Sequence, residues 1–485
     1  MRSLFSGVSG LKGHQTRMDV IGNNIANVNT TGFKSSRATF ADAISQTTSG
    51  ASSPTGNLGG TNPKQIGLGS NVSSIDLIFT DGSVQSTGKN TDLCLSGSGL
   101  FVVKQGIQTY YTRNGAFEFD AEGNYVMPGS GLFVQGWMGE NGTVNTSGAV
   151  TNINVPSGKS MAAQVTGLVT YANNLNSDML LITGVTGGTT IDGRQVATAS
   201  SAVTLTFSDG TTQTVTSGSY VSGHGMPITT TATIYDSLGA SHSVPILLEI
   251  INKTPGAGNV WTAAVAPTEK TTSTGTTVYD TTIHCDDGTI IKPTLGTTTI
   301  VFDTVGAYVP YDEKTDSGSK IGSLSLEYEA PPTGSGVKTP QSVALSFSDV
   351  TQYAGSNTVN ASADGNAAGT LSSLSIDASG TITGTYTNGI KQAEAQIAIA
   401  QFNNASGLTK TGNSLYQESN NSGTPNVKTA GDLGVTITGS ALEMSNVDIA
   451  NEFSDMIVTQ RGFQSNSKII TVSDELLETV INMKR

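Results

Sequence analysis

An apolar heptad pattern at each end of the 485-residue chain constrains its fold more than any other feature. Near the N-terminus, the stripe residues follow in alternating steps of four and three: Leu4, Val8, Leu11, Gln15, Met18, Gly22 and Ile25. The same spacing returns near the C-terminus in Ile449, Phe453, Met456, Gln460, Phe463, Ser467, Ile470, Asp474, Leu477 and Ile481. This spacing predicts two long helices, each with an apolar face that must be covered in water.

Two kinds of partner could cover these faces, and the sequence leaves both open. The helices could pair within one chain as a coiled coil, or they could bundle with helices of other copies. Ser445 or Asn446 is the expected N-cap of the second helix. We expect apolar residues of the two helices to bury against one another, namely Leu4, Val8, Leu11, Met18, Ile21 and Ile25 against Phe453, Met456, Ile457, Phe463, Ile470 and Leu477.

The chain between these helices is typical of β structure. It is rich in Gly and Thr, with alternating apolar residues that predict many short strands and turns. A recurring unit of an apolar residue, Asp, small residues and Gly predicts hairpin corners at 119–123, 235–239, 302–306 and 376–380. The two most similar copies, 119–123 and 376–380, lie on either side of a long stretch. This placement indicates one β domain that is interrupted by another.

The expected fold is therefore mainly β with α-helical ends, in a nested multidomain architecture of β-barrel or sandwich-like domains. Residues 1–30 and 442–485 are expected to form the terminal coiled-coil helices. Residues 31–70, rich in Gly, Ser, Thr and Asn, are expected to form an irregular connector. Residues 71–145 and 366–441 should form an inner β domain, and residues 146–365 an outer β domain of one or two lobes inserted into it.

Charge and composition argue against several functions. The chain has 24 Lys and Arg against 37 Asp and Glu, a formal net charge of −13. No basic cluster could follow a phosphate backbone, so we expect no nucleic-acid binding. The N-terminus lacks the apolar run that a cleaved signal peptide contains, and no stretch approaches the roughly 18 apolar residues of a membrane span. We therefore expect neither signal cleavage nor membrane insertion.

No set of reactive residues indicates catalysis. The four histidines lie far apart and form no metal-binding spacing, and neither a nucleophile elbow nor a phosphate-binding loop is present. Cys94 and Cys285, the two cysteines, lie in no CxxC motif. The sequence therefore predicts a protein that is not an enzyme and that uses no cofactor and no metal.

Both ends of the chain resemble the flagellar rod–hook family of axial proteins. Residues 97–126 are also similar to the inner β domain of that family. Residues 3–40 resemble its opening signature, with Asn23, Asn24, Asn27, Asn29, Gly32 and Phe33 at motif positions that are expected to shape the exit from the first helix. Residues 441–485 resemble its closing segment, with Met456, Ile457, Gln460, Arg461, Phe463, Gln464 and Asn466 at motif positions.

This resemblance implies a structural subunit that self-assembles into the curved, tubular flagellar hook, the flexible universal joint that transmits torque from the motor rod to the filament. It also implies export through the flagellar type III apparatus to a site outside the cytoplasm. Contacts with the flagellar rod, the hook cap and the hook–filament junction proteins are implied as well. The large insert favours a hook subunit. A distal rod subunit is the nearest alternative, ahead of a secreted β-rich adhesin and of a glycan hydrolase.

Overall fold

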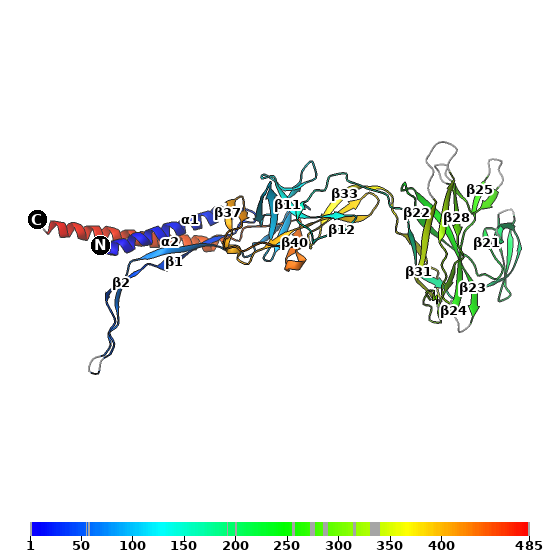
Figure 1. The fold of residues 1–485 in the computed structure, drawn as a ribbon, viewed down its shortest axis with the longest axis horizontal. Helices are drawn as coiled ribbons and strands as arrows, with labels where there is room; N and C mark the ends of the chain where they lie inside the picture. Colours follow the sequence, from blue (N-terminus) through cyan, green and yellow to red (C-terminus); the bar gives the residue numbers. More distant parts are fainter. Residues whose placement is uncertain are drawn as a thin grey trace. The chain divides into compact units, whose positions relative to one another are not determined.

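The chain folds into two units that are nested in sequence (Figure 1). Unit 1 combines Met1–Lys159 with Leu371–Arg485, and unit 2 consists of Ser160–Thr370. The mainly β fold with a helix at each end is confirmed. The structure, a computed structural model, describes residues 2–54, 56, 59–191, 193–198, 201–254, 258–271, 277–284, 290–313, 317–329 and 340–483.

Both terminal helices form in unit 1. Helix α1 spans Arg2–Ala26 and α2 spans Ile449–Asn482. The predicted N-cap of α2 was wrong, because the helix begins after Asp448. The Asp448 carboxylate accepts hydrogen bonds from two otherwise unpaired backbone N–H groups of the first turn, at 2.9 and 3.3 Å. The helical part of the C-terminal segment is therefore shorter than the predicted 442–485.

The segment 31–70 is not the irregular connector that its composition predicted. It contributes to a long antiparallel hairpin in which β1 (Ser36–Asp42) pairs with β4 (Ser70–Leu77) and β2 (Ser45–Ser49) pairs with β3 (Lys64–Gly67). Every residue of β2 and β3 is exposed. These strands therefore lack the alternation of buried and exposed residues from which a strand is recognised in a sequence.

The β part of unit 1 is built around a sheet that is buried on both faces. The alternating side chains of β7 divide between two hydrophobic cores, with Phe101 and Val103 in one and Leu100 and Val102 in the other. The main path of the sheet runs through β33 (Gly369–Ile376), β34 (Thr381–Tyr386), β35 (Lys391–Ile397), β11 (Leu132–Glu140), β7 (Leu100–Gln105), β8 (Gln108–Thr112), β38 (Leu415–Gln417) and β37 (Thr409–Gly412).

Shorter elements complete unit 1. The strands that pair at the margins of the sheet are β9 (Glu118–Phe119), β10 (Tyr125–Met127), β12 (Thr143–Val144), β13 (Thr151–Asn152), β36 (Ile399–Gln401) and β39 (Asn426–Lys428). Two further ribbons join early and late parts of the chain, β5 (Val84–Ser86) with β41 (Ala441–Glu443) and β6 (Leu93–Ser96) with β40 (Thr436–Gly439). Two short 3-10 helices lie at Ala405–Gly407 and Gly431–Leu433.

The insert begins later than the predicted residue 146. Strand β13 pairs with β11 of unit 1, and Ile153 and Val155 are buried in a core of that unit. The chain that follows residue 146 thus still belongs to the inner domain. The boundaries lie at 159/160 and 370/371.

Unit 2 contains a β-sandwich around one large core. The core includes Trp261 from one sheet and the stacked rings of Tyr171 and Phe347, 4.5 Å apart, from the other. One sheet consists of β27 (Ile283–His284), β28 (Ile290–Leu295), β30 (Leu324–Glu329), β31 (Gln341–Tyr353), β15 (Leu168–Asn176) and β32 (Asn360–Ala363). The other consists of β22 (Ile228–Tyr235), β23 (Ser241–Thr254), β24 (Gly258–Val265) and β29 (Thr299–Val301).

A smaller lobe with its own hydrophobic core lies within unit 2. It is attached to the sandwich through Glu249, which is fully buried on β23. Arg194 of the small lobe donates two hydrogen bonds to this carboxylate, and His224 Nδ1 lies 2.7 Å from it. The strands of the lobe are β16 (Ile182–Gly187), β19 (Val203–Phe207) and β20 (Thr212–Val215), and β17 (Thr189–Ile191), β18 (Arg194–Ala197) and β21 (Gly218–Tyr220).

We predict that Glu249→Gln destabilises unit 2 at pH 7 and flattens its acid sensitivity. Burial raises the pKa of Glu249, but hydrogen bonds from His224 and Arg194 outweigh it, so the pKa is lowered overall. A lowered carboxyl pKa adds stability above the unfolded pKa of about 4.3, and this is lost as pH falls. At pH 7 the variant should lose about 3 kcal/mol, because Arg194 is left without its anion.

The measurement is urea unfolding at pH 7 and pH 4, followed by Trp261 fluorescence in a Trp137→Phe background. Glu327→Gln, an exposed position on β30, is the control and should have almost no effect. Equal losses for the two variants at pH 7 would contradict the role given to Glu249.

The four predicted hairpin corners are confirmed. In each, Asp Oδ1 accepts hydrogen bonds of 2.8–2.9 Å from the backbone N–H groups two and four residues later. Each corner glycine has a φ between +82° and +85°, which disfavours any residue with a Cβ. The four Asp–Gly pairs are Asp120–Gly123, Asp236–Gly239, Asp303–Gly306 and Asp377–Gly380.

Candidate assembly surface

The two terminal helices pack against each other in antiparallel fashion through small residues. Gly10 of α1 lies against Asn466 of α2, and Gly462 of α2 lies against the ring of His14. A Cβ atom at Gly10 or at Gly462 would come within 2.7 Å of these neighbours. The glycines therefore allow an approach between the helices that larger side chains would prevent.

Polar contacts join the helices nearer the β domain. Asn24 donates hydrogen bonds from Nδ2 to Glu452 at 2.9 Å and to the Ser36 carbonyl at 2.8 Å, and its Oδ1 accepts one from the Ser36 N–H at 3.0 Å. Burial raises the pKa of Glu452. A more exposed ion pair of 3.0 Å joins Arg17 and Asp455. Asn24 thus ties α1 to α2 and to the first strand of the hairpin.

The predicted apolar stripes are not the line of contact between the helices. That line is displaced by one position along each helix, and runs through Gly7, Gly10, His14, Arg17 and Asn24 on α1 and through Glu452, Asp455, Thr459, Gly462 and Asn466 on α2. Val8, Phe453, Ile457 and Leu477 are exposed within the single chain, so their burial stays a prediction for contacts between copies. Of the other stripe residues, Ile21 is buried, while Leu4, Leu11, Met18, Ile25, Met456, Phe463 and Ile470 are half-buried.

One signal in the sequence could have located the true line of contact. Gly7, Gly10 and Gly13 lie in the interior of a helix, where each glycine costs about 1 kcal/mol relative to alanine. Close packing is a reason to retain glycine at such positions. Gly13 has the same role toward the hairpin, because a Cβ there would lie 2.9 Å from the Phe40 ring.

Because the line of contact between the helices is displaced from the apolar stripe, apolar side chains of α2 remain exposed to solvent. Ile449, Phe453 and Ile457 form one such line at i, i+4 and i+8, with Ile457 59% exposed. Such spacing places the three side chains on one face of the helix. This surface and the half-buried stripe residues beside it form the candidate assembly surface of the protein.

We predict that Gly10→Leu separates the ends of the two helices, whereas Gly22→Leu does not. The added side chain at Gly10 collides with Asn466, but a Cβ at Gly22 has nothing within 4 Å. Leucine also has the higher helix propensity, so the substitution at Gly22 should be neutral or slightly stabilising. Amide hydrogen exchange over residues 2–20 should accelerate only in the first variant, and equal rates in both variants would contradict the packing role of Gly10.

The family-motif residues after α1 shape its exit. Asn27 donates from Nδ2 to the Asn23 carbonyl at 2.9 Å, closing the last turn, while Asn29 is exposed. Gly32 has a φ of +65°, and a Cβ there would lie 2.4 Å from the backbone nitrogen of Asn114. Phe33 is buried, and the Lys410 ammonium lies 4.3 Å from the centre of its ring. These positions fix the path of the chain from helix to hairpin.

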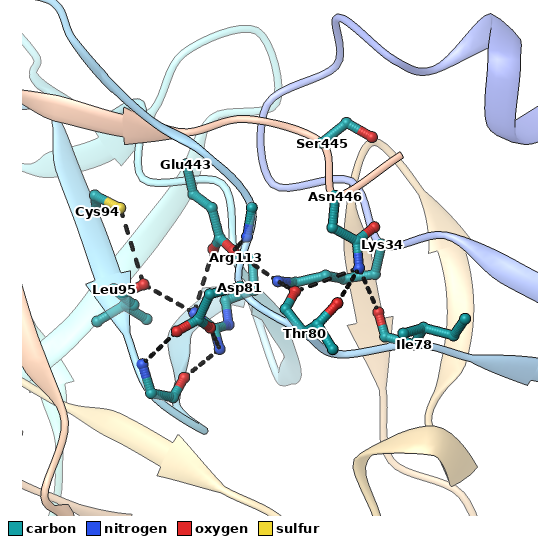
Figure 2. A network of polar contacts seen from close by, with 12 residues as sticks. Lys34, Ile78, Thr80, Asp81, Cys94, Leu95, Arg113, Glu443, Ser445 and Asn446 are labelled. Carbon is teal, nitrogen blue, oxygen red and sulfur yellow. Dashed lines mark hydrogen bonds and ion pairs between the residues drawn. The ribbon is translucent and has the colours of Figure 1, made fainter. Parts of the chain in front are cut away.

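Where the chain leaves α1 and where it enters α2, buried charges connect both ends of the chain to the β domain (Figure 2). Glu443 accepts from Lys34 at 2.6 Å and from Arg113 at 3.2 Å, and all three side chains are 1% exposed. Arg113 also pairs with Asp81 at 3.2 Å. We call Lys34, Asp81, Arg113, Glu443 and Asn446 the junction cluster.

Backbone groups add hydrogen bonds to the junction cluster, although Arg113 Nε has no partner within the described residues. Lys34 donates to the Thr80 carbonyl at 2.6 Å, and Arg113 donates to the carbonyls of Leu95, at 3.0 Å, and Gly97. Burial lowers the pKa of Lys34. Figure 2 shows these groups converging from separate segments of the chain. These hydrogen bonds offset part of the cost of burying charged groups, which is high when the groups are unpaired.

Asn446 does not cap α2 as predicted, and instead connects separate segments of the chain through its side chain. Its Oδ1 accepts from the Ser35 N–H at 2.8 Å, and its Nδ2 donates to the Ile78 carbonyl at 2.9 Å and to Thr80 Oγ1 at 3.0 Å. The residue joins the chain leaving α1 to the chain entering α2. Cys94 lies beside the cluster, where burial raises the pKa of its thiol to about 11.

The motif residues of α2 have different environments. Gln460, Arg461 and Gln464 are exposed, and Arg461 Nη1 donates to Gln464 Oε1 at 3.1 Å. Asn466 belongs to the line of contact with α1. The three exposed polar residues therefore have no role in the packing of the single chain that would explain their place in the motif.

The described part of the chain offers no cluster of three or more His, Cys, Asp and Glu side chains that could hold a metal ion. Among the helices of the described residues, none is long and apolar enough to cross a membrane. Cys285 lies outside the described residues.

Four family profiles match separate stretches of the chain. They are "Flagella basal body rod protein" over residues 4–34, "Flagellar hook protein FlgE/F/G D1 domain" over 94–171, "Flagellar basal body protein FlaE D2 domain" over 226–366 and "Flagellar basal body rod FlgEFG protein C-terminal" over 438–483. The first and last profiles cover the two helices. The third lies within unit 2.

Curated relatives match over the whole length. The chain is 39% identical to the flagellar hook protein FlgE of Treponema pallidum and 38% identical to that of Borreliella burgdorferi, in each case over 100% of both chains. It is 30% identical to that of Escherichia coli over 98% of each chain. The chain therefore belongs to the flagellar hook protein family. A solved structure of Helicobacter pylori FlgE2 is similar with a TM-score of 0.45 at 14% identity, covering 74% of this chain and 100% of that one.

Proposed function

We propose that this chain is the structural subunit that self-assembles into the flagellar hook. The full-length similarity to relatives named flagellar hook protein carries this proposal. The exposed apolar line of Ile449, Phe453 and Ile457 supports it, because such a surface in a structural protein needs a partner. Further copies of the same helix pair provide matching apolar surface.

In the proposed assembly, the terminal helices form the inner contacts of the tube through the sequence-predicted residues that the single chain leaves exposed or half-buried. The β units would lie outside them. Only 13% of residues are charged, so few ion pairs fix one register between neighbouring β units. This composition supports a tube that bends as it turns and passes torque from rod to filament.

Because the chain belongs to the flagellar hook protein family, we also propose its binding partners and its export route. A hook subunit contacts the flagellar rod at one end of the tube, the hook cap during growth and the hook–filament junction proteins at the other end. We assign its export to the flagellar type III apparatus, without a cleaved signal peptide. N-terminal sequencing of hooks purified from cells tests the last point, and should return the residues that follow the initiating Met.

The distinguishing experiment is deletion of the gene followed by electron cryotomography of the basal bodies. Loss of a hook subunit leaves a complete rod without a hook, whereas loss of a distal rod subunit shortens the rod itself. Return of the hook with the full chain, but not with a chain limited to residues 71–440, is the expected result. A shortened rod in the deletion strain would contradict the proposal in favour of the rod alternative.

A further inference from the structure

An open groove of about 500 Å³ runs between α1 and residues 68–72 of the hairpin, at the start of β4. Phe5 and Val8 of α1 and Leu68 and Val72 of the hairpin give it an apolar lining, to which Lys12 adds one positive charge. Phe5 is 66% exposed and Val8 is 38% exposed. The groove is therefore a hydrophobic surface that the single chain does not cover.

A matching ridge of apolar side chains lies on the second half of α2. Its members follow in steps of three or four and so share one face of the helix. All five are between 42% and 86% exposed: Ile469, Val472, Leu476, Val480 and Met483. We call them the C-terminal ridge. The charged residues among them are acidic: Asp474, Glu475 and Glu478.

The ridge of a chain cannot enter the groove of the same chain. Gly10 and His14 face α2, whereas Val8 and Lys12 lie about 120–160° away around α1, at 100° per residue. Helix α1 therefore stands between α2 and the groove. The ridge and the groove are surfaces that only two different copies can bring together.

The geometry points to a docking contact in which the C-terminal ridge of one copy fills the groove of another. This inference rests on the proposed function and names the surfaces that the assembly would use. Leu476, Val480 and Met483 have the i, i+4, i+7 spacing by which an amphipathic helix anchors in a groove. Lys12 of the groove is complementary in charge to Glu475 beside the ridge.

The contact has the symmetry that a growing polymer needs. Ridge and groove are different surfaces, so each copy that donates a ridge still offers a free groove. Such a heterologous contact continues from copy to copy and produces a ring or an open helical array. A self-complementary contact would stop at a dimer.

The first test places cysteines on both surfaces of the full chain. Val72→Cys and Val480→Cys are combined with Cys285→Ser, while Cys94 is kept because it is buried. The gene for this cysteine variant replaces the native gene in the bacterium. Hooks isolated from these cells are oxidised and analysed on a denaturing gel. We expect a ladder of multimers that collapses on reduction. The matched control pairs Val480→Cys with Ile75→Cys, an exposed position on β4 outside the groove, and should give no reducible ladder.

The second test reverses the charges across the contact and remains informative if the cysteine chain fails to assemble. Lys12→Glu should cause loss of hooks, and Lys12→Glu combined with Glu475→Lys should restore them. Normal hooks without a reducible ladder, or no rescue by the double reversal, would overturn the docking contact while the proposed function stands. A wild-type strain whose hooks lack this chain would overturn the proposed function itself.

Discussion

Cells that carry Ile457→Asp in this chain are expected to make no hook, although the purified subunit folds normally. Ile457 is 59% exposed in the single chain, so an aspartate there costs little in the monomer. In an assembly that buries this position, each contact loses about 2 kcal/mol of apolar burial, more than a tenfold loss in each association step. Burial of the new unpaired charge adds to the loss.

Two measurements are needed for this prediction. Electron microscopy of cells counts hooks, while circular dichroism and thermal unfolding of the purified variant report its fold. Ile457→Leu is the matched control, because it keeps the apolar volume at the same position and should assemble normally. Hooks of normal number and length from the aspartate variant would exclude this face of α2 from the subunit contacts.

A loss of about 3–5 kcal/mol in the stability of unit 1 is expected for Glu443→Gln. The substitution leaves Lys34 and Arg113 in the interior without their anion, and removing one member of a buried ion pair costs about this much. Glu118→Gln is the control, because Glu118 pairs with Lys89 at a similar 3.1 Å with both side chains about half exposed. An exposed pair contributes roughly 0–1 kcal/mol.

Urea unfolding followed by Trp137 fluorescence, in a Trp261→Phe background, reports on unit 1 alone. Each variant removes one carboxylate charge, which faces two buried cations at position 443 and one exposed cation at position 118, so the difference between them measures the contribution of the buried contacts. Equal losses would mean that water reaches the junction cluster.

Much of the fold could be predicted from local sequence patterns. Heptad spacing located both helices, and the Asp–Gly units located four hairpin corners, because these structures are determined by residues a few positions apart. The hairpin of β2 and β3 could not be found in this way. Its strands are exposed on both sides, so hydrophobicity does not alternate along them.

The contacts between distant segments were the hardest to predict. In α1 and α2 the apolar stripe predicts the line of contact, whereas the real line consists of small and polar residues that lie beside it. The junction cluster has no sequence signal at all. Lys34 and Glu443 are 409 residues apart, and nothing local distinguishes a lysine that will be buried from one that will not.

The distance in sequence between Lys34 and Glu443 has a consequence for the order in which the chain can fold. Unit 2 is continuous in sequence and has its own core, so its contacts can form as soon as Ser160–Thr370 is free of the ribosome or of a transport channel. The charges around Lys34 must wait for Glu443, which lies close to the end of the chain. A prematurely ended chain would leave Lys34 and Arg113 unpaired and the helices unjoined. The junction cluster thus makes the folding of unit 1 depend on an intact C-terminal segment of the chain.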